Sequence, residues 1–379
     1  MATKGYYTYN EIMQQPRMWL NEYEKLRMQR NQIECFVTPY INKGYEVIFT
    51  GAGTSAYIGD TLEVMMAGTL FEGARAVATT DLITHPQAYL SADKKVLLVS
   101  FARSGNSPES LGAVNLANQI CGKNIAHIFI TCNQEGQLAK IANHDNCLLL
   151  LLPPETDDKS LAMTSSFSTM LLTGILLSDI SHLEAHHTYI HNLSTNAAVA
   201  LTKYDAPIRE IASRSFSRAI FLGSGALKGI AEESHLKLQE LTDGSVVCSF
   251  DSFLGFRHGP KAVVNAESLL VYLLSNDPQV RRYETDLIKQ IQANNHVVAT
   301  IAVSDSPVEI PGVSFDLNVV LNCGLPQGDA LCIPYVFVAQ LLGYYKSIAA
   351  GLNPDAPSVS GNIARVVEGV TIYPYQAEK

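Results

Sequence analysis

Two short segments of the sequence carry side chains that could move protons. In the first, Glu233, Lys237 and Glu240 follow one another at spacings of four and three residues, so a helix would place them on one face. In the second, His258 precedes Gly259-Pro260, which favours a tight turn and keeps the imidazole out of a helix. A glutamate and a histidine in one cleft are common groups for general acid–base catalysis. On spacing alone, however, the helical residues indicate a solvated row of ion pairs, and a single loop histidine is most often incidental.

A second set of residues is suited to binding an anion. The turn Gly51-Ala52-Gly53-Thr54-Ser55 follows the apolar run 47–50, and the loop 100–109 contains Ser104-Gly105-Asn106-Ser107 before Pro108. Proline favours the first position of a helix, and hydroxyl and N–H groups at a helix start bind anions. At neighbouring ends of parallel strands the two loops would meet on one phosphate. The alternative is an ordinary helix start capped by Ser107.

The first glycine turn also fits the dinucleotide-binding pattern GxGxxA through Ala56. A nicotinamide dehydrogenase would need an acidic residue about 20 positions further on. Asp81 lies about 30 positions on. The serine loop then favours a phosphate over a dinucleotide.

The elements that must position these residues occur twice. Val47–Thr50 and its glycine turn are repeated about 172 residues later as Ala219–Leu222 followed by Gly223-Ser224-Gly225. Two further pairs of apolar runs continue the repeat: 96–100 with 269–273, and 126–131 with 297–301. Strands that alternate with helical stretches predict a parallel sheet covered by helices. The sequence therefore predicts two copies of one α/β domain, and only the first has the serine-rich second loop.

Other segments give simpler expectations. Periodic apolar residues predict a helix within 9–44, and helices over 108–120, 164–180 and 231–241. The polar stretch 181–204 is interpreted as a solvated interdomain helix, and 370–373 as a β run. His182, His186, His187 and His191 form two pairs four residues apart, which could bind a metal on a helix face, but neither a carboxylate nor a cysteine joins them in the motif. The sequence therefore favours no metal site.

Composition limits the classes of function. The chain has 379 residues, 47% of them hydrophobic and 17% charged, with a net charge of −9, which disfavours nucleic acid as a partner. Seven cysteines without metal spacing indicate reduced thiols and a cytoplasmic protein. Apolar stretches too short to span a bilayer and the absence of a leader sequence predict no membrane association.

Taken together, the motifs resemble the sugar isomerase (SIS) family, whose best-known member is the isomerase half of glucosamine-6-phosphate synthase. The motifs are GTS at 53–55, SxxxSGxS at 100–107, ExxxKxxE at 233–240 and HGP at 258–260. The resemblance covers nearly the whole chain. It implies two tandem SIS domains, each a flavodoxin-like three-layer α/β/α fold with a parallel sheet. The expected divisions are an N-terminal helical segment (1–44), the first SIS domain (45–193) and the second (194–379).

The resemblance also implies roles for individual residues. Glu240 falls on the family's proton-transfer glutamate, His258 on its ring-opening histidine, and Lys237 and Glu233 on its accessory residues. The expected phosphate ligands are Gly53, Thr54, Ser55, Arg103, Ser104, Gly105 and Ser107, with Arg103 where the family commonly has glutamine.

Two positions depart from the synthases. Arg365 replaces a lysine of the tail, and because arginine cannot form a Schiff base, only charge stabilisation would remain. No glutaminase domain is expected before the SIS pair, and the residue after Met1 is Ala2 rather than a nucleophilic cysteine.

Segments 51–60, 104–110, 163–166 and 255–261 are more similar to one subgroup, the tagatose-6-phosphate ketose/aldose isomerases, also described as galactosamine-6-phosphate deaminases. The resemblance therefore implies deamination and isomerisation of galactosamine 6-phosphate without a cofactor or metal, in a homodimer or higher homo-oligomer with shared active sites. A ketose–aldose isomerase that does not deaminate, and a non-catalytic sugar-phosphate sensor, are the alternatives.

Overall fold

The computed structural model describes residues 4–294, 296–324, 332–359, 361–367 and 369–376. The chain forms two compact units that are not continuous in sequence. The β1–β5 unit comprises Asn21–Asp157, Thr169–His186 and Ile363–Lys379. The β6–β10 unit comprises Met1–Leu20, Asp158–Ser168 and His187–Asn362.

The sheet of the β1–β5 unit is parallel throughout its described strands, in the order β2-β1-β3-β4-β5. Its strands are β1 (Glu46–Thr50), β2 (Arg75–Ala76), β3 (Val96–Ala102), β4 (Ile125–Thr131) and β5 (Cys147–Leu151). β3 and β4 are buried along their whole length, as expected for central strands covered on both faces. Thr50 pairs with Ser100, so the loops after β1 and β3 begin at the same edge of the sheet.

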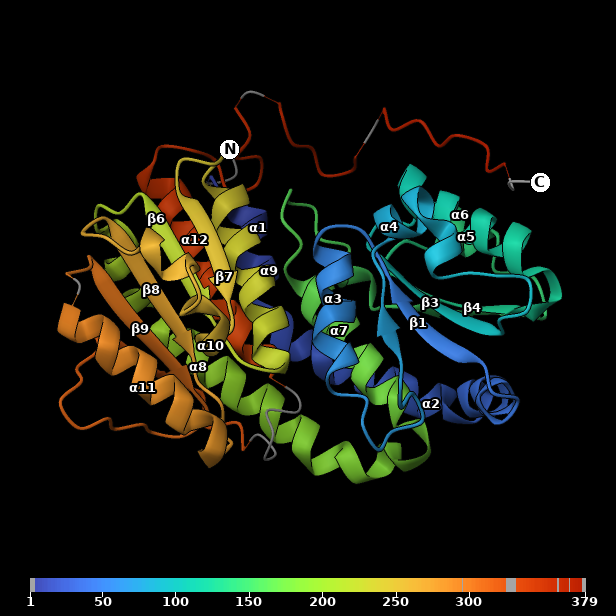
Figure 1. The fold of residues 1–379 in the computed structure, drawn as a ribbon, viewed down its shortest axis with the longest axis horizontal. Coiled ribbons are helices and arrows are strands. Elements are labelled where there is room, and N and C mark those ends of the chain that lie inside the picture. The colour runs from blue at the N-terminus through green and yellow to red at the C-terminus, as the bar shows by residue number, and fades with distance from the viewer. Residues whose placement is uncertain (1–3, 295, 325–331, 360, 368, 377–379) are drawn as a thin grey trace. The chain divides into compact units, whose positions relative to one another are not determined.

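Helices cover both faces of this sheet (Figure 1). The helices are α2 (Gln15–Asn42), α3 (Thr54–Glu63), α4 (Thr79–Thr84), α5 (Pro108–Cys121), α6 (Gln137–Lys140) and α7 (Ser165–Ser178), with short 3-10 turns η1 (Pro86–Ala88), η2 (Gly122–Asn124), η3 (Pro154–Thr156) and η4 (Ile180–His186). One core cluster joins Ile48 and Leu98 of the strands to Leu82 of α4 and Ala113 of α5. A glycine on α7, Gly174, allows close approach to Leu62 of α3.

The β6–β10 unit repeats this arrangement. Its parallel sheet has the order β7-β6-β8-β9-β10, which corresponds strand by strand to the first sheet. The strands are β6 (Arg218–Leu222), β7 (Val247–Asp251), β8 (Ser268–Leu273), β9 (Ala299–Ser304) and β10 (Leu317–Val320). The predicted duplication and the predicted pairs of apolar runs are therefore confirmed.

The helices of the β6–β10 unit are α1 (Tyr6–Met13), α8 (His187–Ser213), α9 (Ala226–Leu241), α10 (Phe253–Phe256), α11 (Pro278–Asn294) and α12 (Phe337–Ala349), with 3-10 turns η5 (Pro260–Val263) and η6 (Ile333–Val336). Phe253 of α10 and Leu287 of α11 share a core cluster with Tyr272 of β8. The other face of the sheet is covered by α9, which packs on α12.

Several predicted elements change in the structure. The N-terminal helix is confirmed but is divided at Gln14 into α1 and α2. The stretch 181–204 is helical but not simply solvated, because Ile190, Leu193 and Leu201 of α8 are buried. The predicted β run 370–373 is wrong, since these residues form no strand. Among the described residues, no helix combines the length and the apolar character needed to cross a membrane.

Candidate active site

The first part of the site is the glycine turn between β1 and α3. Gly53 has φ 55° and ψ −129°, a conformation that residues with a side chain rarely adopt. A Cβ on Gly51 would lie 2.4 Å from the carbonyl oxygen of Ser55, so this turn also requires glycine there. Thr54 and Ser55 form the first turn of α3 and are each 5% exposed. The turn therefore places two hydroxyls at the start of a helix, where an anion is favoured.

The second part is the loop between β3 and α5. Gly105 has φ 62°, and Ser107 is the N-cap of α5, where its Oγ accepts a hydrogen bond from the Ser110 N–H (3.2 Å). The Ser107 hydroxyl donates to Ser110 Oγ (2.7 Å). The predicted start of a helix at Pro108 is confirmed, and so is the helix cap by Ser107 that the sequence offered as the alternative. The loop begins beside the glycine turn because β1 and β3 are neighbours. Phosphate binding by these loops stays a prediction.

The strand on the other side, β4, braces the serine loop. The amide of Asn133 donates to the Ser104 carbonyl (3.0 Å), and the hydroxyl of Thr131 donates to the Arg103 carbonyl (3.3 Å). Sequence reasoning missed both residues. The signal was present, because the polar segment Thr131-Cys132-Asn133 follows a predicted strand next to β3 and must end at the same edge.

Arg103 and Arg365 lie together in the β1–β5 unit. The guanidinium of Arg103, only 6% exposed, donates to the carbonyl oxygen of Arg365. The side chain of Arg365 forms an ion pair with Asp157 (Nη2 to Oδ1, 2.6 Å). The tail arginine is thus next to the serine loop, as its assignment to the site requires. Asp157 was missed by the sequence because nothing local connects it to position 365.

The third part of the site is the charged face of α9. Lys237 Nζ lies 2.6 Å from Glu240 Oε2 and 3.4 Å from Glu233 Oε1. The side chains of Lys237 and Glu233 are 1% and 0% exposed, whereas that of Glu240 is 21% exposed. The expectation of a solvated row of ion pairs is therefore wrong. Charged groups are buried at a large cost in solvation, and only Glu240 of the three remains open to a ligand.

His235, two positions from both Glu233 and Lys237 on α9, was also missed. Its ring stacks on Phe250 with centroids 4.8 Å apart, and its Nδ1 contacts the carbonyl oxygen of Glu232. Burial lowers the pKa of His235, because the charged imidazolium is poorly solvated there.

His258 lies on the turn between α10 and η5, outside both helices, as predicted. Gly259 after it has φ 123°, and Pro260 begins η5. The imidazole is exposed, and it makes no hydrogen bond with the described residues. His258 is thus presented outward from the β6–β10 unit.

The structure places the predicted residues in two groups. The phosphate ligands and Arg365 belong to the β1–β5 unit, and Glu233, Lys237, Glu240 and His258 belong to the β6–β10 unit. Within these groups the two loops share a sheet edge, and the three α9 residues form one charge cluster. The catalytic and phosphate-binding roles themselves stay predictions.

Two of the four histidines at 182–191 have a carboxylate partner. His182 Nδ1 and His186 Nε2 contact the two carboxylate oxygens of Asp179 at 2.7 and 2.8 Å. Burial alone would raise the pKa of Asp179, but these two hydrogen bonds lower it, and the pKa lies below its usual value. The rings of His187 and His191 lie 4.4 Å apart between centroids. Asp179 is thus the carboxylate that the sequence pattern did not reveal.

Comparison with known proteins places the chain in a family. The SIS domain model matches residues 40–177. The chain is 39% identical over 376 residues to the D-galactosamine-6-phosphate deaminase AgaS of Shewanella sp. (strain ANA-3), covering 98% of this chain and 92% of that protein. It is 38% identical to the protein of the same name from Escherichia coli, covering 99% and 98%.

A solved structure has the same fold over its full length. The tagatose-6-phosphate ketose/aldose isomerase from Escherichia coli matches with a TM-score of 0.86 and 35% identity, covering 99% of each chain. Together with the two parallel sheets, these relatives show that the chain belongs to the SIS domain family. The family resemblance and the fold class predicted from sequence are both confirmed.

Proposed function

We propose that this protein is an enzyme that converts galactosamine 6-phosphate and water to tagatose 6-phosphate and ammonia. The observation that carries the proposal is the identity of 38–39% over nearly the full length to proteins named D-galactosamine-6-phosphate deaminase. The residues of each unit support it: the β1–β5 unit has hydroxyls at helix starts that suit a phosphate, and the β6–β10 unit has the charge cluster of Lys237 and Glu240 that suits proton transfer.

The phosphate group is bound by the glycine turn and the serine loop. Thr54, Ser55, Ser104 and Ser107 supply hydroxyls, and the start of α3 supplies backbone N–H groups. Arg103 adds positive charge beside the serine loop. Binding energy from the phosphate, which takes no part in the reaction, then positions the reacting end of the sugar.

Proton transfers complete the reaction. His258 moves a proton between the anomeric hydroxyl and the ring oxygen, which opens the pyranose. Glu240 takes the proton from carbon two, the carbonyl oxygen is protonated, and an enolamine forms. The proton then returns to carbon one, and the amino nitrogen loses a proton, which leaves an imine at carbon two. Water adds to that imine, and ammonia leaves.

The buried neighbours position the base. Lys237 donates to Oε2 of Glu240 at 2.6 Å and thereby fixes the orientation of the partly exposed carboxylate. Glu233 lies behind Lys237 and is fully buried, so it orients the ammonium from the protein side. Arg365, fixed by Asp157, contributes charge stabilisation beside the phosphate.

A second candidate is aldose–ketose isomerisation without loss of ammonia. It is supported by the 35% identity to the tagatose-6-phosphate ketose/aldose isomerase from Escherichia coli. The same base and the same ring-opening histidine serve both reactions, since both begin with removal of the carbon-two proton.

The test is to supply galactosamine 6-phosphate and glucosamine 6-phosphate in parallel and to measure ammonia and ketose 6-phosphate. We expect one ammonia and one tagatose 6-phosphate per galacto substrate consumed, with little turnover of the gluco epimer. Turnover of galactose 6-phosphate without ammonia from either amino sugar would instead support the isomerase. If no sugar phosphate is turned over, the enzyme assignment fails.

We also propose a homodimer or higher homo-oligomer in which His258 serves the site of a neighbouring subunit, in the cytoplasm. The exposed position of His258 on its turn supports this, because a ring-opening group should be shielded from bulk water during the reaction. Sedimentation and activity measured over a dilution series test it. A fully active monomer contradicts it.

A further inference from the structure

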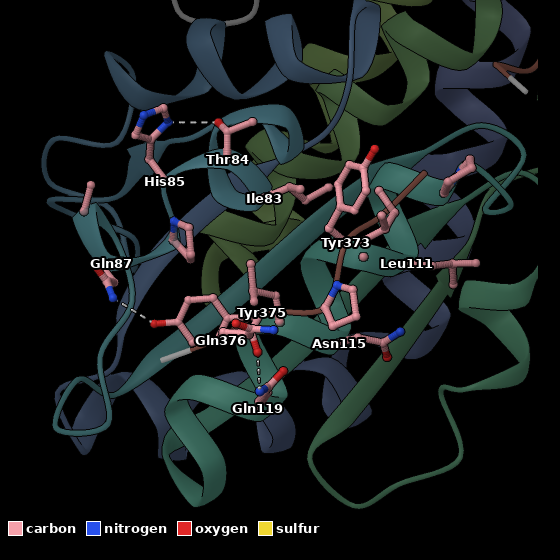
Figure 2. A pocket seen from close by; sticks show the side chains of 17 residues that line it. Ile83, Thr84, His85, Gln87, Leu111, Asn115, Gln119, Tyr373, Tyr375 and Gln376 are labelled. Atoms are coloured by element: carbon pink, nitrogen blue, oxygen red, sulfur yellow. Dashed lines mark hydrogen bonds between the residues drawn. The ribbon is translucent and has the colours of Figure 1, made fainter. Parts of the chain in front are cut away.

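The C-terminal segment 372–376 lies in a groove of the β1–β5 unit. The groove is formed by α4 with η1 on one side and by α5 on the other, and a cavity of about 800 Å³ remains beside the segment. Figure 2 shows Tyr375 between Gln87 and Gln119, which face it from the two walls, whereas the ring of Tyr373 points away from them. None of the described residues that line this cavity is an aspartate, glutamate, lysine or arginine, so packing and hydrogen bonds of neutral amide and hydroxyl groups hold the segment.

A helical glycine makes room for the tail. A Cβ on Gly112 of α5 would lie 3.1 Å from Cγ2 of Ile372 and 3.3 Å from Cδ1 of Ile83. Glycine within a helix costs about 1 kcal/mol of stability relative to alanine. We infer that the close packing of Ile372 against Gly112 offsets this cost.

Tyr375 is held at two atoms. Gln87 Nε2 donates to its hydroxyl oxygen (3.1 Å), and Gln119 Nε2 donates to its carbonyl oxygen (3.4 Å). Both walls of the groove thus bind the same residue. Tyr373, two positions earlier, is 80% exposed and makes no hydrogen bond to the described residues.

The other end of the tail meets the serine loop. Arg365 accepts a hydrogen bond from Arg103 through its carbonyl oxygen and pairs with Asp157 through its guanidinium. α5 itself begins at Pro108, directly after the loop. α5 therefore follows the serine loop directly, and one turn after its start Gly112 contacts Ile372.

We propose that Ile372 and Tyr375 anchor the tail, and that this anchoring positions Arg365 and Arg103 at the serine loop for binding of the substrate phosphate. Ile372 and Tyr375 are positioning residues, because they act through the two arginines rather than on the substrate. The inference rests on the proposed function, since it assigns the anchor to the substrate's phosphate.

The test compares two tyrosines of the same tail. Tyr375→Ala removes both the ring and the bond from Gln87, whereas the matched control Tyr373→Ala removes an exposed ring. We expect Tyr375→Ala to raise KM for galactosamine 6-phosphate about three- to tenfold, the size of one or two neutral hydrogen bonds, with kcat within about twofold. The inhibition constant of inorganic phosphate should rise by the same factor. Tyr373→Ala should leave both unchanged.

A double-mutant cycle separates positioning from general stability. If the anchor acts through Arg365, Tyr375→Ala should add little further rise in KM to an Arg365→Ala variant. Gln87→Leu should reproduce part of the Tyr375→Ala effect, and melting temperatures should change little in all these variants. A fall in kcat with unchanged KM, or equal effects of the two tyrosine variants, overturns the proposal.

Failure of the anchor is distinguishable from failure of the proposed function. If the wild-type protein releases no ammonia, the function fails, and the anchor is then tested by titration of inorganic phosphate alone. Unchanged phosphate affinity in Tyr375→Ala overturns the anchor whether or not the protein is a deaminase.

Discussion

The two glycine turns have the same backbone but different side chains. Gly53 has φ 55° and ψ −129°, and Gly225 has φ 59° and ψ −130°. A Cβ on Gly223 would lie 2.2 Å from the carbonyl oxygen of Leu227, the same obstruction that Gly51 meets at Ser55. The first turn, however, continues with Thr54 and Ser55, and the second with Ala226 and Leu227. The fold thus supplies the helix start twice, and the side chains decide which one is suited to an anion.

The loops after β3 and β8, which correspond to one another in the two copies, also differ in their side chains. In the second copy the Ser275 N–H donates to the carboxylate of Glu284, at 3.1 and 3.3 Å, and Glu284 is fully buried. Arg281 pairs with Glu284 (3.4 Å), and Asp277 caps α11. This loop therefore binds an anionic group of its own chain. The first copy caps α5 with the neutral Ser107.

In the helices that follow the glycine turns, α3 and α9, it is the second copy that carries the additional functional groups. α3 has ten residues and ends at Glu63, whereas α9 has 16 residues and carries Lys237 and Glu240 in its last turns. In the proposed function, the β1–β5 unit supplies the groups that hold an anion, and the β6–β10 unit supplies the groups that move protons. The proposal thus assigns binding to one copy of the fold and chemistry to the other, and three comparisons between corresponding positions of the two copies test how the copies differ.

The largest effect is expected at Glu240. Glu240→Gln removes the base and should lower kcat by about 10²- to 10⁴-fold while the circular dichroism spectrum and melting temperature stay close to wild type. The control is Glu63→Gln in the first copy. Its carboxylate accepts a hydrogen bond from the Ala76 N–H (2.9 Å), which an amide oxygen can also accept. Comparable losses in both variants would contradict the assignment of chemistry to the second copy.

The two helix caps should give a smaller and asymmetric effect. Ser107→Ala and Asp277→Ala each remove an N-cap, and each should cost about 1 kcal/mol in the free energy of unfolding. Only Ser107→Ala should also raise KM, by about tenfold or more, because a hydrogen bond to a charged phosphate is stronger than a neutral one. Urea unfolding and steady-state kinetics measure the two quantities. A rise in KM for Asp277→Ala would break the comparison.

The third comparison concerns the pH dependence of stability rather than activity. His127 of β4 pairs with Leu98, and the corresponding residue of β9 is Thr300, which pairs with Leu270. Burial lowers the pKa of His127 to about 4 from an ordinary 6.5. Between these values the unfolded state binds the proton and the folded state does not, so stability is lost as pH falls from about 6.5 to about 4.

His127→Thr, the residue of the second copy, should remove this loss. Between pH 7 and pH 5 the wild type should lose about 2 kcal/mol of unfolding free energy more than the variant. Urea titrations of both proteins at the two pH values measure the difference. Equal losses would show that His127 does not titrate as its burial implies.

Local signals account for what the sequence predicted well. The strands end in glycine turns whose backbone needs glycine at Gly51 and Gly53, and Ser107-Pro108 marks a helix start through its own chemistry. Such signals involve neighbours in sequence, and they were sufficient for three strands of each sheet and for the turns that follow β1 and β3.

The errors share a physical cause, which is dependence on distant partners. Spacing placed Glu233 and Lys237 on one face of α9, but burial is decided by what packs there, including α12 more than 90 residues later. The run 370–373 has strand-forming residues, but a strand also needs a neighbour for its hydrogen bonds. The tail instead packs against α5 at Gly112.

The fit between Gly112 and Ile372 also has a consequence for variation among relatives. Each position limits the volume allowed at the other, because a Cβ at 112 would lie 3.1 Å from the isoleucine. In an alignment of proteins with this tail, the two columns should covary, with a larger residue at 112 accompanied by a smaller one at 372. The tail and the helix would then evolve as a pair although 260 positions separate them in the sequence.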